Sequence, residues 1–244
     1  MKIDTETILE RLESLSDEAT ASILQRFFKT GPGEYGEGDL FRGIRVPVLR
    51  SLCREYRQVD LATSITLLAS QWHEDRLFAL LILVELYRTS DDEKRGAIYQ
   101  LYCSQTARIN NWDLVDLTAP QIVGRHLQNR DRLPLYRFAA SESLWERRIA
   151  IISTFHFIKQ SEFADTLTIA EHLLDDPEEL IHKATGWMLR EVGKRDQPLL
   201  ETFLVCHANR MPRVTLRYAI ERFPEELRQT YLKLKRIQGT FTTA

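Results

Sequence analysis

Apolar residues along this 244-residue chain recur at spacings of three and four, the period of one face of an α-helix. The pattern predicts helices over nine stretches: residues 46–56, 60–70, 75–88, 112–127, 144–158, 161–174, 178–194, 198–208 and 211–222. No stretch alternates apolar and polar residues convincingly with the period of two that a half-buried β-strand needs. The chain is therefore expected to be all-α.

The predicted helices come in pairs. The second helix of each pair begins near residue 75, 112, 145, 178 or 212, so the steps between pairs are 37, 33, 33 and 34 residues. A step of this size, built from two antiparallel helices, is typical of an α-solenoid with degenerate HEAT-like repeats. Such a solenoid curves, and its concave side forms one long groove. An irregular helical bundle is the alternative architecture.

One domain is expected over residues 1–244, with an N-terminal helical pair in 1–30, a Gly-rich connecting loop in 31–45, helical repeats in 46–236 and a tail in 237–244. Five of the ten glycines lie in the segment from Gly31 to Gly43. Gly31, Gly33 and Gly36 match a dinucleotide-binding fingerprint, but no strand precedes them and nearby carboxylates would repel a pyrophosphate. The match is therefore interpreted as accidental.

Composition narrows the class of protein. The chain has only 10 glycines and 8 prolines, too few for the many tight turns of a β-sandwich. Its three cysteines lie far apart, which excludes a disulfide scaffold and fits a reducing cytoplasm. No apolar run reaches membrane-spanning length, and the polar N-terminus does not resemble a signal peptide. We therefore expect a cytoplasmic protein without a membrane partner.

The net charge of the chain is −2, but its charged residues are distributed unevenly along the sequence. Residues 181–244 contain 12 Lys and Arg residues against 6 Asp and Glu residues, whereas the rest of the chain is acidic. A basic C-terminal quarter indicates a polyanionic partner. A cation-rich end that is simply solvated is the alternative interpretation.

Three side chains occupy unexpected positions on the predicted helices. Asp116 shares an arc with Trp112 and with apolar residues, so its carboxylate either faces a cleft or forms a local cap or salt bridge. Arg148 lies beside an apolar stripe and needs an anion, unless it extends to solvent. Trp187 lies among basic residues, which suits stacking on a sugar or base beside phosphate contacts.

The basic residues around Trp187 are candidates for contacts with phosphate groups. They are Lys183, Arg190 and Lys194, followed by Arg213 and Arg217 on the next predicted helix pair. No His-Glu-x-x-His or Cys-x-x-Cys motif suggests a metal site, and the sequence has no P-loop and no Gly-x-Ser-x-Gly elbow. We expect no metal and no other cofactor.

Four blocks of sequence coincide with these unusual positions. They are Glu37–Pro47 with Leu49-Arg50, Asn111–Asp116, Leu144–Arg148 with Ala150, and Lys183–Glu191. In this order and spacing the blocks resemble the AlkD-type DNA alkylation repair family, which consists of HEAT-like-repeat DNA glycosylases. The resemblance covers roughly residues 20–225. At Phe27-Phe28 the chain departs from relatives that carry a tyrosine.

This resemblance implies a glycosylase that excises cationic N3- and N7-alkylated purines, such as 3-methyladenine and 7-methylguanine, from duplex DNA in base excision repair. It assigns Asp116 as the catalytic carboxylate, Trp112 and Trp187 as paired tryptophans, and Arg148 as the active-site arginine. The implied partner is double-stranded DNA containing alkylated bases, bound by a monomer that associates with the nucleoid. The family is understood to act without flipping the base into a pocket, unlike most glycosylases.

The implied chemistry needs few residues. A cationic alkylated purine can leave as a neutral base without being protonated first, so the general acid of a sugar hydrolase is dispensable. One carboxylate can then stabilise the oxocarbenium-like state and hold the attacking water. Two other classes of function stay open: a non-catalytic HEAT-like-repeat scaffold that binds DNA, and a solenoid that binds only protein.

Overall fold

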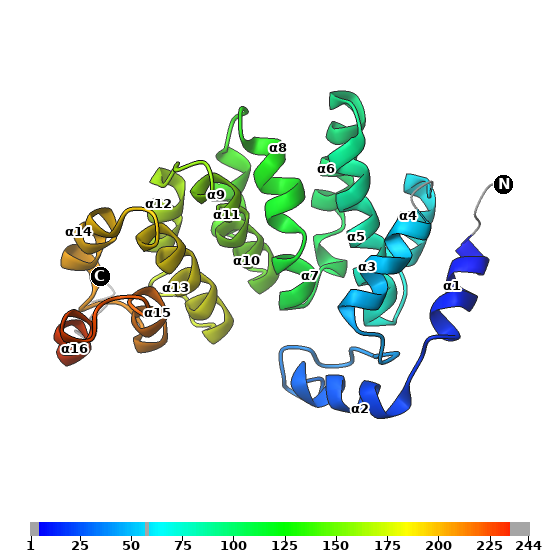
Figure 1. Cartoon of the computed structure of the whole chain (residues 1–244), viewed down its shortest axis with the longest axis horizontal. Helices are drawn as coiled ribbons and strands as arrows, with labels where there is room; N and C mark the ends of the chain where they lie inside the picture. Colours follow the sequence, from blue (N-terminus) through cyan, green and yellow to red (C-terminus); the bar gives the residue numbers. More distant parts are fainter. Residues whose placement is uncertain (1–4, 57–58, 235–244) are drawn as a thin grey trace, which may run out of the picture. The chain divides into compact units, whose positions relative to one another are not determined.

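The structure is a computed structural model that describes residues 5–56 and 59–234 (Figure 1). The chain forms two compact units, Met1–His126 and Leu127–Ala244, here called the N-terminal unit and the C-terminal unit. Across the described residues the regular structure is helical, and the extended pairing is limited to a backbone bridge between Leu40 and Trp72. The prediction of an all-α chain is confirmed. The single domain stays a prediction, and the predicted tail, 237–244, lies outside the described residues.

The N-terminal unit starts with two helices, passes through the Gly-rich loop, and continues as a series of packed helices. Carboxylates cap several of them, because Asp17, Asp60 and Asp91 each accept a hydrogen bond from a backbone N–H three residues later. The elements are α1 (Thr5–Glu13), α2 (Glu18–Phe27), α3 (Val46–Glu55), α4 (Leu61–Leu68), α5 (His73–Thr89), α6 (Asp92–Ser104), the 3₁₀ helix η1 (Thr106–Arg108), α7 (Trp112–Asp116), the π-helix η2 (Pro120–Gly124) and α8 (Arg125–Leu127).

The C-terminal unit is a second series of packed helices. Ser143 and Asp196 cap two of these helices in the same way, and prolines stand at or before the first turn of four. The elements are α9 (Leu133–Ala139), α10 (Leu144–Ser153), α11 (Phe155–Ile158), α12 (Ala164–His172), α13 (Glu179–Gly193), α14 (Gln197–His207), α15 (Arg213–Ala219) and α16 (Glu225–Lys233).

The helical repeat predicted from the sequence is present in both units. The second helices of the predicted pairs begin within two residues of the expected positions, at His73, Trp112, Leu144, Glu179 and Arg213. In the C-terminal unit α13 packs against α10 and α15, while α9 and α14 pack against α10 and α13. In the N-terminal unit α5 packs against α3, α4 and α7. This pattern of pairing and stacking is that of an α-solenoid with HEAT-like repeats.

The stack in the C-terminal unit depends on a small residue at Gly186. A Cβ atom at this position would lie 2.6 Å from the carbonyl oxygen of Thr215 and 2.6 Å from Cβ of Tyr218. Only glycine therefore allows α13 and α15 to approach this closely. The helix that carries Trp187 is consequently held tightly against its successor.

The sequence predicts one continuous helix over residues 112–127, and this continuity is wrong. The structure has α7, a turn, the π-helix η2 and α8 in this range. Pro120 has no N–H to donate to the carbonyl oxygen of Asp116, so the regular α-helical hydrogen-bond ladder is interrupted there. The backbone widens into a π-helix directly after the segment that carries Asp116, a feature found often at functional sites.

Candidate functional site

Trp112 and Asp116 lie one turn apart on α7, so the structure places them on the same side of one short helix. Both side chains are half-buried. Asn111 caps this helix by accepting a hydrogen bond from the backbone N–H of Trp112 at 2.8 Å. Burial raises the pKa of the nearby Tyr102 hydroxyl, and the negative charge of Asp116 contributes to the same shift. The Asp116 carboxylate thus stands at the boundary between solvent and core.

A row of aromatic rings holds Trp112 in place. Trp112 stacks on Phe28 with 5.0 Å between ring centroids, Phe28 stacks on Phe41 at 5.0 Å, and Phe41 stacks on His73 at 4.4 Å. The edge of Phe27 meets Trp112 at 5.8 Å, and 61% of Phe27 is exposed. The departure noted at Phe27-Phe28 therefore lies directly against a candidate site residue. Sequence reasoning noted the pair of phenylalanines but did not place it beside Trp112.

His73 connects the Gly-rich loop to α7 through a buried charge network. Its two ring nitrogens lie 2.8 Å from the Asp39 carboxylate and 2.9 Å from the Asp113 carboxylate. Burial alone lowers the pKa of His73, but Asp113 and Asp39 outweigh it and raise the pKa to about 9. At neutral pH the ring is therefore an imidazolium that donates to both carboxylates. Arg76 adds a 2.6 Å contact to the other oxygen of Asp39.

The N-terminus of α5 fixes the end of the same loop. The Glu74 carboxylate accepts hydrogen bonds from the backbone N–H groups of Arg42, Gly43 and Ile44, at 2.8, 2.9 and 3.1 Å. The Arg42 guanidinium donates to Asp75 at 2.7 Å. These bonds hold the loop that supplies Asp39 and Phe41, and so they support the position of Trp112 indirectly.

The first part of the loop does not present free N–H groups to a phosphate. Glu34 accepts the hydrogen bond of the Gly31 N–H, and Glu37 accepts that of the Gly33 N–H, both at 2.9 Å. This geometry agrees with the interpretation that the resemblance to a dinucleotide-binding fingerprint is accidental.

The pKa of His73 leads to a prediction about stability. The pKa of His73 in the folded chain lies above the value of about 6.5 expected in the unfolded chain, so protonation of this residue stabilises the fold. The contribution is complete below about pH 6.5 and is lost as the pH rises through the folded pKa. We expect the free energy of unfolding to fall by about 1–3 kcal/mol between pH 6.5 and pH 9.5 through this group. Denaturant titrations at a series of pH values measure this.

Two variants distinguish the contribution of His73 to the pH dependence of stability from that of other titrating groups. His73→Gln removes the imidazolium, so the decline in the free energy of unfolding between pH 6.5 and pH 9.5 should become shallower. His172→Gln, on the exposed end of α12, should leave the decline unchanged. Equal pH profiles for the wild type and His73→Gln would contradict the role given to the His73 network.

In the C-terminal unit, Arg148 and Trp187 lie on the packed helices α10 and α13. Arg148 is only 5% exposed, and its Nη1 donates to the carbonyl oxygen of Leu180 in α13 at 2.6 Å. Trp187 is half-buried and contacts Phe155, with 5.9 Å between ring centroids. The ammonium of Lys159 lies 4.2 Å from the centroid of the Phe155 ring. Arg148 thus joins α10 to the helix that carries Trp187.

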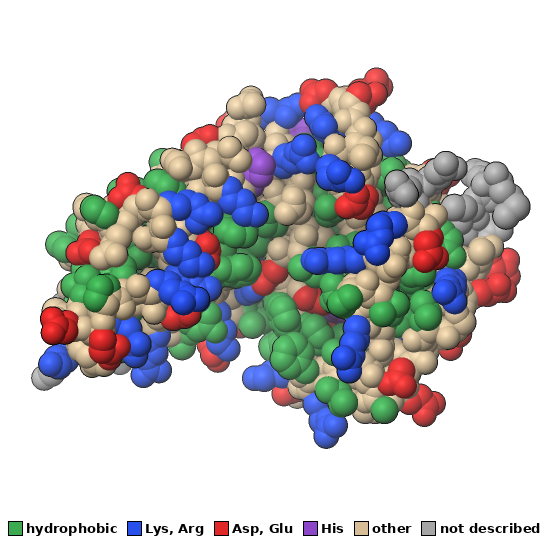
Figure 2. Space-filling view, viewed as in Figure 1, with side chains coloured by type: hydrophobic (Ala, Val, Ile, Leu, Met, Phe, Trp, Pro, Cys, Tyr) green, Lys and Arg blue, Asp and Glu red, His purple; other side chains and the backbone are tan. Residues whose placement is uncertain are grey.

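The cations predicted to contact phosphate have partners within their own unit. Lys183 pairs with Glu179 at 2.7 Å, Lys194 pairs with Glu191 at 2.6 Å, and Arg190 pairs with Glu221. Figure 2 shows acidic side chains interspersed among basic ones on the viewed face of this unit. The local positive potential is therefore smaller than the count of basic residues suggests.

The other two residues predicted to contact phosphate, Arg213 and Arg217, differ in their surroundings. Arg213 donates to the carbonyl oxygens of Leu232 and Leu234, at 2.6 and 3.1 Å, and so connects α15 to the end of α16. Arg217 is exposed and forms no hydrogen bond or ion pair with the residues that the structure describes. Of these two, Arg217 is the one available to an external anion.

The four candidate site residues lie in two units, two residues in each. Trp112 and Asp116 share one helix of the N-terminal unit, and Arg148 and Trp187 lie on adjoining helices of the C-terminal unit. Their common position on one concave face stays a prediction. Among the described residues, no group of three or more His, Cys, Asp and Glu side chains is arranged to hold a metal ion. None of the described helices has the length and apolar character needed to cross a membrane.

Comparison with known proteins gives a family and a related solved structure. Residues 8–223 match the family described as DNA alkylation repair enzyme. A solved structure, "Predicted DNA alkylation repair enzyme from Enterococcus faecalis", is similar with a TM-score of 0.66, covering 86% of this chain and 97% of that chain at 16% sequence identity. This low identity supports the fold alone. No curated protein matches the sequence.

Proposed function

The chain belongs to the DNA alkylation repair enzyme family, and from this membership we propose that it is a DNA glycosylase that removes cationic N3- and N7-alkylated purines from duplex DNA. The observation that carries the proposal is the pair Trp112 and Asp116, a carboxylate and an indole on one face of a short, firmly anchored helix. A carboxylate held at the edge of the core beside an aromatic ring suits the stabilisation of a cation.

The proposed reaction is a hydrolysis at the anomeric carbon of the damaged nucleotide. The bond from C1′ to the purine nitrogen breaks, and its electron pair leaves with the base, which becomes neutral. Asp116 stabilises the positive charge that develops on the sugar and orients a water molecule. The water oxygen bonds to C1′, and the proton that this water loses passes to the Asp116 carboxylate or to solvent. No general acid is needed, because the leaving base is already cationic.

The other three residues have supporting roles in this proposal. Trp112 packs against the deoxyribose and contributes cation–π attraction of roughly 0.5–2 kcal/mol to the developing charge. Trp187 supplies a second aromatic surface for the DNA. Arg148 is a positioning residue, because its bond to the Leu180 carbonyl holds the helix that carries Trp187.

The test of this proposal compares two leaving bases. The wild-type chain should release 7-methylguanine from a duplex and should not release uracil from a duplex of the same sequence, because uracil is neutral and no general acid assists its departure. The measurement is chromatographic detection of free base under single-turnover conditions. Release of uracil at a rate similar to that of 7-methylguanine would contradict the mechanism.

A further inference from the structure

The helix α7, which carries Trp112 and Asp116, is too short to fix its own orientation. It spans five residues, Trp112–Asp116, whereas isolated helices shorter than about 12 residues are marginal in water. Pro120 then interrupts the hydrogen bonds that would continue it. The positions of the indole and the carboxylate therefore depend on contacts between α7 and the rest of the N-terminal unit.

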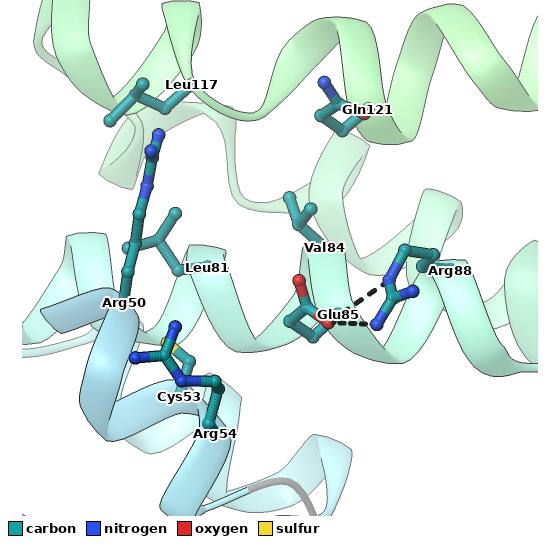
Figure 3. A pocket seen from close by; sticks show the side chains of 9 residues that line it. All are labelled: Arg50, Cys53, Arg54, Leu81, Val84, Glu85, Arg88, Leu117 and Gln121. Atoms are coloured by element: carbon teal, nitrogen blue, oxygen red, sulfur yellow. Dashed lines mark hydrogen bonds and ion pairs between the residues drawn. The ribbon is translucent and has the colours of Figure 1, made fainter. Parts of the chain in front are cut away.

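Apolar packing holds α7 against the core without defining its direction. Leu114 and Val115 are fully buried, but hydrophobic contacts are non-directional. Just beyond the C-terminal end of α7, Leu117 and Gln121 line a cavity of about 520 Å³, across from Leu81 of α5 (Figure 3). Packing is incomplete on this side, so directional bonds at the N-terminal end are needed to set the orientation of α7.

The residues on both sides of Trp112 are bonded to one pair of buried partners. Asn111, which is fully buried, donates from Nδ2 to the Asp39 carboxylate in a long hydrogen bond of 3.5 Å. Asp113 lies 2.9 Å from Nε2 of His73. His73 in turn lies 2.8 Å from Asp39 through Nδ1. Asp39 and His73 thus fix the start of α7 from both sides of the indole.

Only the protonated form of His73 satisfies both of its carboxylate contacts. An imidazolium has two N–H donors, whereas a carboxylate only accepts. A neutral ring has one N–H, so in either tautomer its other nitrogen would direct a lone pair at a carboxylate oxygen 2.8 or 2.9 Å away. The ring is only 1% exposed, which leaves little access for a compensating water. Glu74, the next residue on α5, adds a third negative charge that attracts the imidazolium.

The neighbouring bonds determine which of the two contacts is lost with the proton. Asp39 also accepts a hydrogen bond from Arg76 at 2.6 Å, and this bond does not depend on His73. The other hydrogen bond of Asp113 in the described part of the chain comes from the N–H of Leu114, at 2.8 Å, within α7 itself. Deprotonation of His73 therefore releases Asp113, and α7 with it, while the Gly-rich loop keeps its attachment to α5.

We propose that His73 and Asp113 are positioning residues of the proposed glycosylase reaction, and that the charged bond between them holds α7 in its catalytic orientation. The proposal rests on the proposed function for one of its readouts, base release. Both residues are buried and act through Trp112 and Asp116 rather than on the DNA. Because the folded pKa of His73 is about 9, the catalytic orientation is complete at neutral pH and is lost as the pH rises through that value.

The first test measures single-turnover release of 7-methylguanine at saturating enzyme between about pH 7 and pH 10, with the rate in buffer subtracted. The wild-type rate should be constant near neutrality and fall with a midpoint near pH 9. Asp113→Asn should remove this fall, because its amide can donate to a neutral imidazole whose own N–H then serves Asp39. His172→Gln is the control and should keep the wild-type profile. A flat wild-type profile, or an unchanged fall in Asp113→Asn, would overturn the proposal.

The second test separates positioning from stability at neutral pH. His73→Gln should slow base release about tenfold or more, because displacing a catalytic group by about 1 Å can cost about a hundredfold in rate. Its affinity for the duplex should stay unchanged, since the buried side chain does not reach the DNA. A purely structural role would lower the amplitude of the single turnover, through loss of folded protein, and leave the rate constant at the wild-type value. That result would overturn the proposal.

Trp112 reports on the same transition without DNA. The difference in fluorescence between the wild type and Trp112→Phe isolates the emission of this indole, and it should change near pH 9 in the wild type but not in an Asp113→Asn background. A chain that shows this change but releases no base would keep the positioning network and lose the glycosylase assignment. A chain that releases base, with no transition in fluorescence or in rate, would keep the assignment and lose the network.

Discussion

In the Asp116→Asn variant, release of 7-methylguanine from duplex DNA is expected to slow by at least about tenfold, which corresponds to a loss of about 1.4 kcal/mol of transition-state stabilisation. Asparagine keeps the size and most of the polarity of aspartate but removes its charge. The charge acts mainly on the cation that forms in the transition state, so the rate falls. DNA affinity should be retained or improved, because a negative charge near the phosphates is lost.

Single-turnover rates at saturating enzyme measure this effect without interference from binding. Asp92→Asn, in the exposed first turn of α6, is a matched change elsewhere in the same unit and should leave the rate unchanged. A folded Asp116→Asn variant that releases 7-methylguanine at the wild-type rate would exclude Asp116 as the catalytic carboxylate.

Gly43→Ala is expected to have the largest effect on stability. Gly43 has a φ angle of +86°, and a Cβ atom there would lie 2.1 Å from the carbonyl oxygen of Asp17 and 2.7 Å from the backbone nitrogen of Ala21. Both obstacles are backbone atoms of the segment that starts α2, so neither can move without displacing that helix. We expect a loss of about 3–5 kcal/mol in the free energy of unfolding, a large share of the total for a typical domain.

Gly33→Ala provides the control for backbone strain. Gly33 has a similar φ angle of +76°, but nothing lies within 4 Å of the position that its Cβ would occupy. This variant should lose only about 1–2 kcal/mol, the cost of a left-handed conformation in a residue with a side chain. Denaturant titrations followed by tryptophan fluorescence measure both variants. Equal losses would show that the contact between the loop and α2 contributes little.

The fold could be predicted from the sequence because its signals are local. The spacing of apolar residues gave the helices, and the nearly constant step between pairs gave the repeat. The predicted helix 112–127 is interrupted at Pro120, because proline has no N–H group to continue the α-helical hydrogen bonds. The apolar pattern continues past Pro120, so it did not show this interruption. The position of Trp112 and Asp116 on one side of the same helix could also be predicted, since residues four apart on one helix share a face.

The surroundings of the site could not be predicted, because they depend on residues far apart in the chain. His73 bridges Asp39 and Asp113, which are separated from it by 34 and 40 positions. The pairing of Arg190 in α13 with Glu221, in the turn after α15, likewise leaves no local pattern. Counting charges therefore overestimated the free positive surface of the C-terminal unit.

The glycosylase assignment is tested by counting the products of one reaction. Purified protein is incubated with a duplex carrying a single 7-methylguanine, and both the free base and the abasic sites are quantified over time. A glycosylase produces one abasic site for each free base, and we predict this ratio together with complete conversion under excess enzyme. Saturable binding of the same duplex, with no base released above the rate in buffer, would exclude the glycosylase assignment and favour a non-catalytic DNA-binding scaffold.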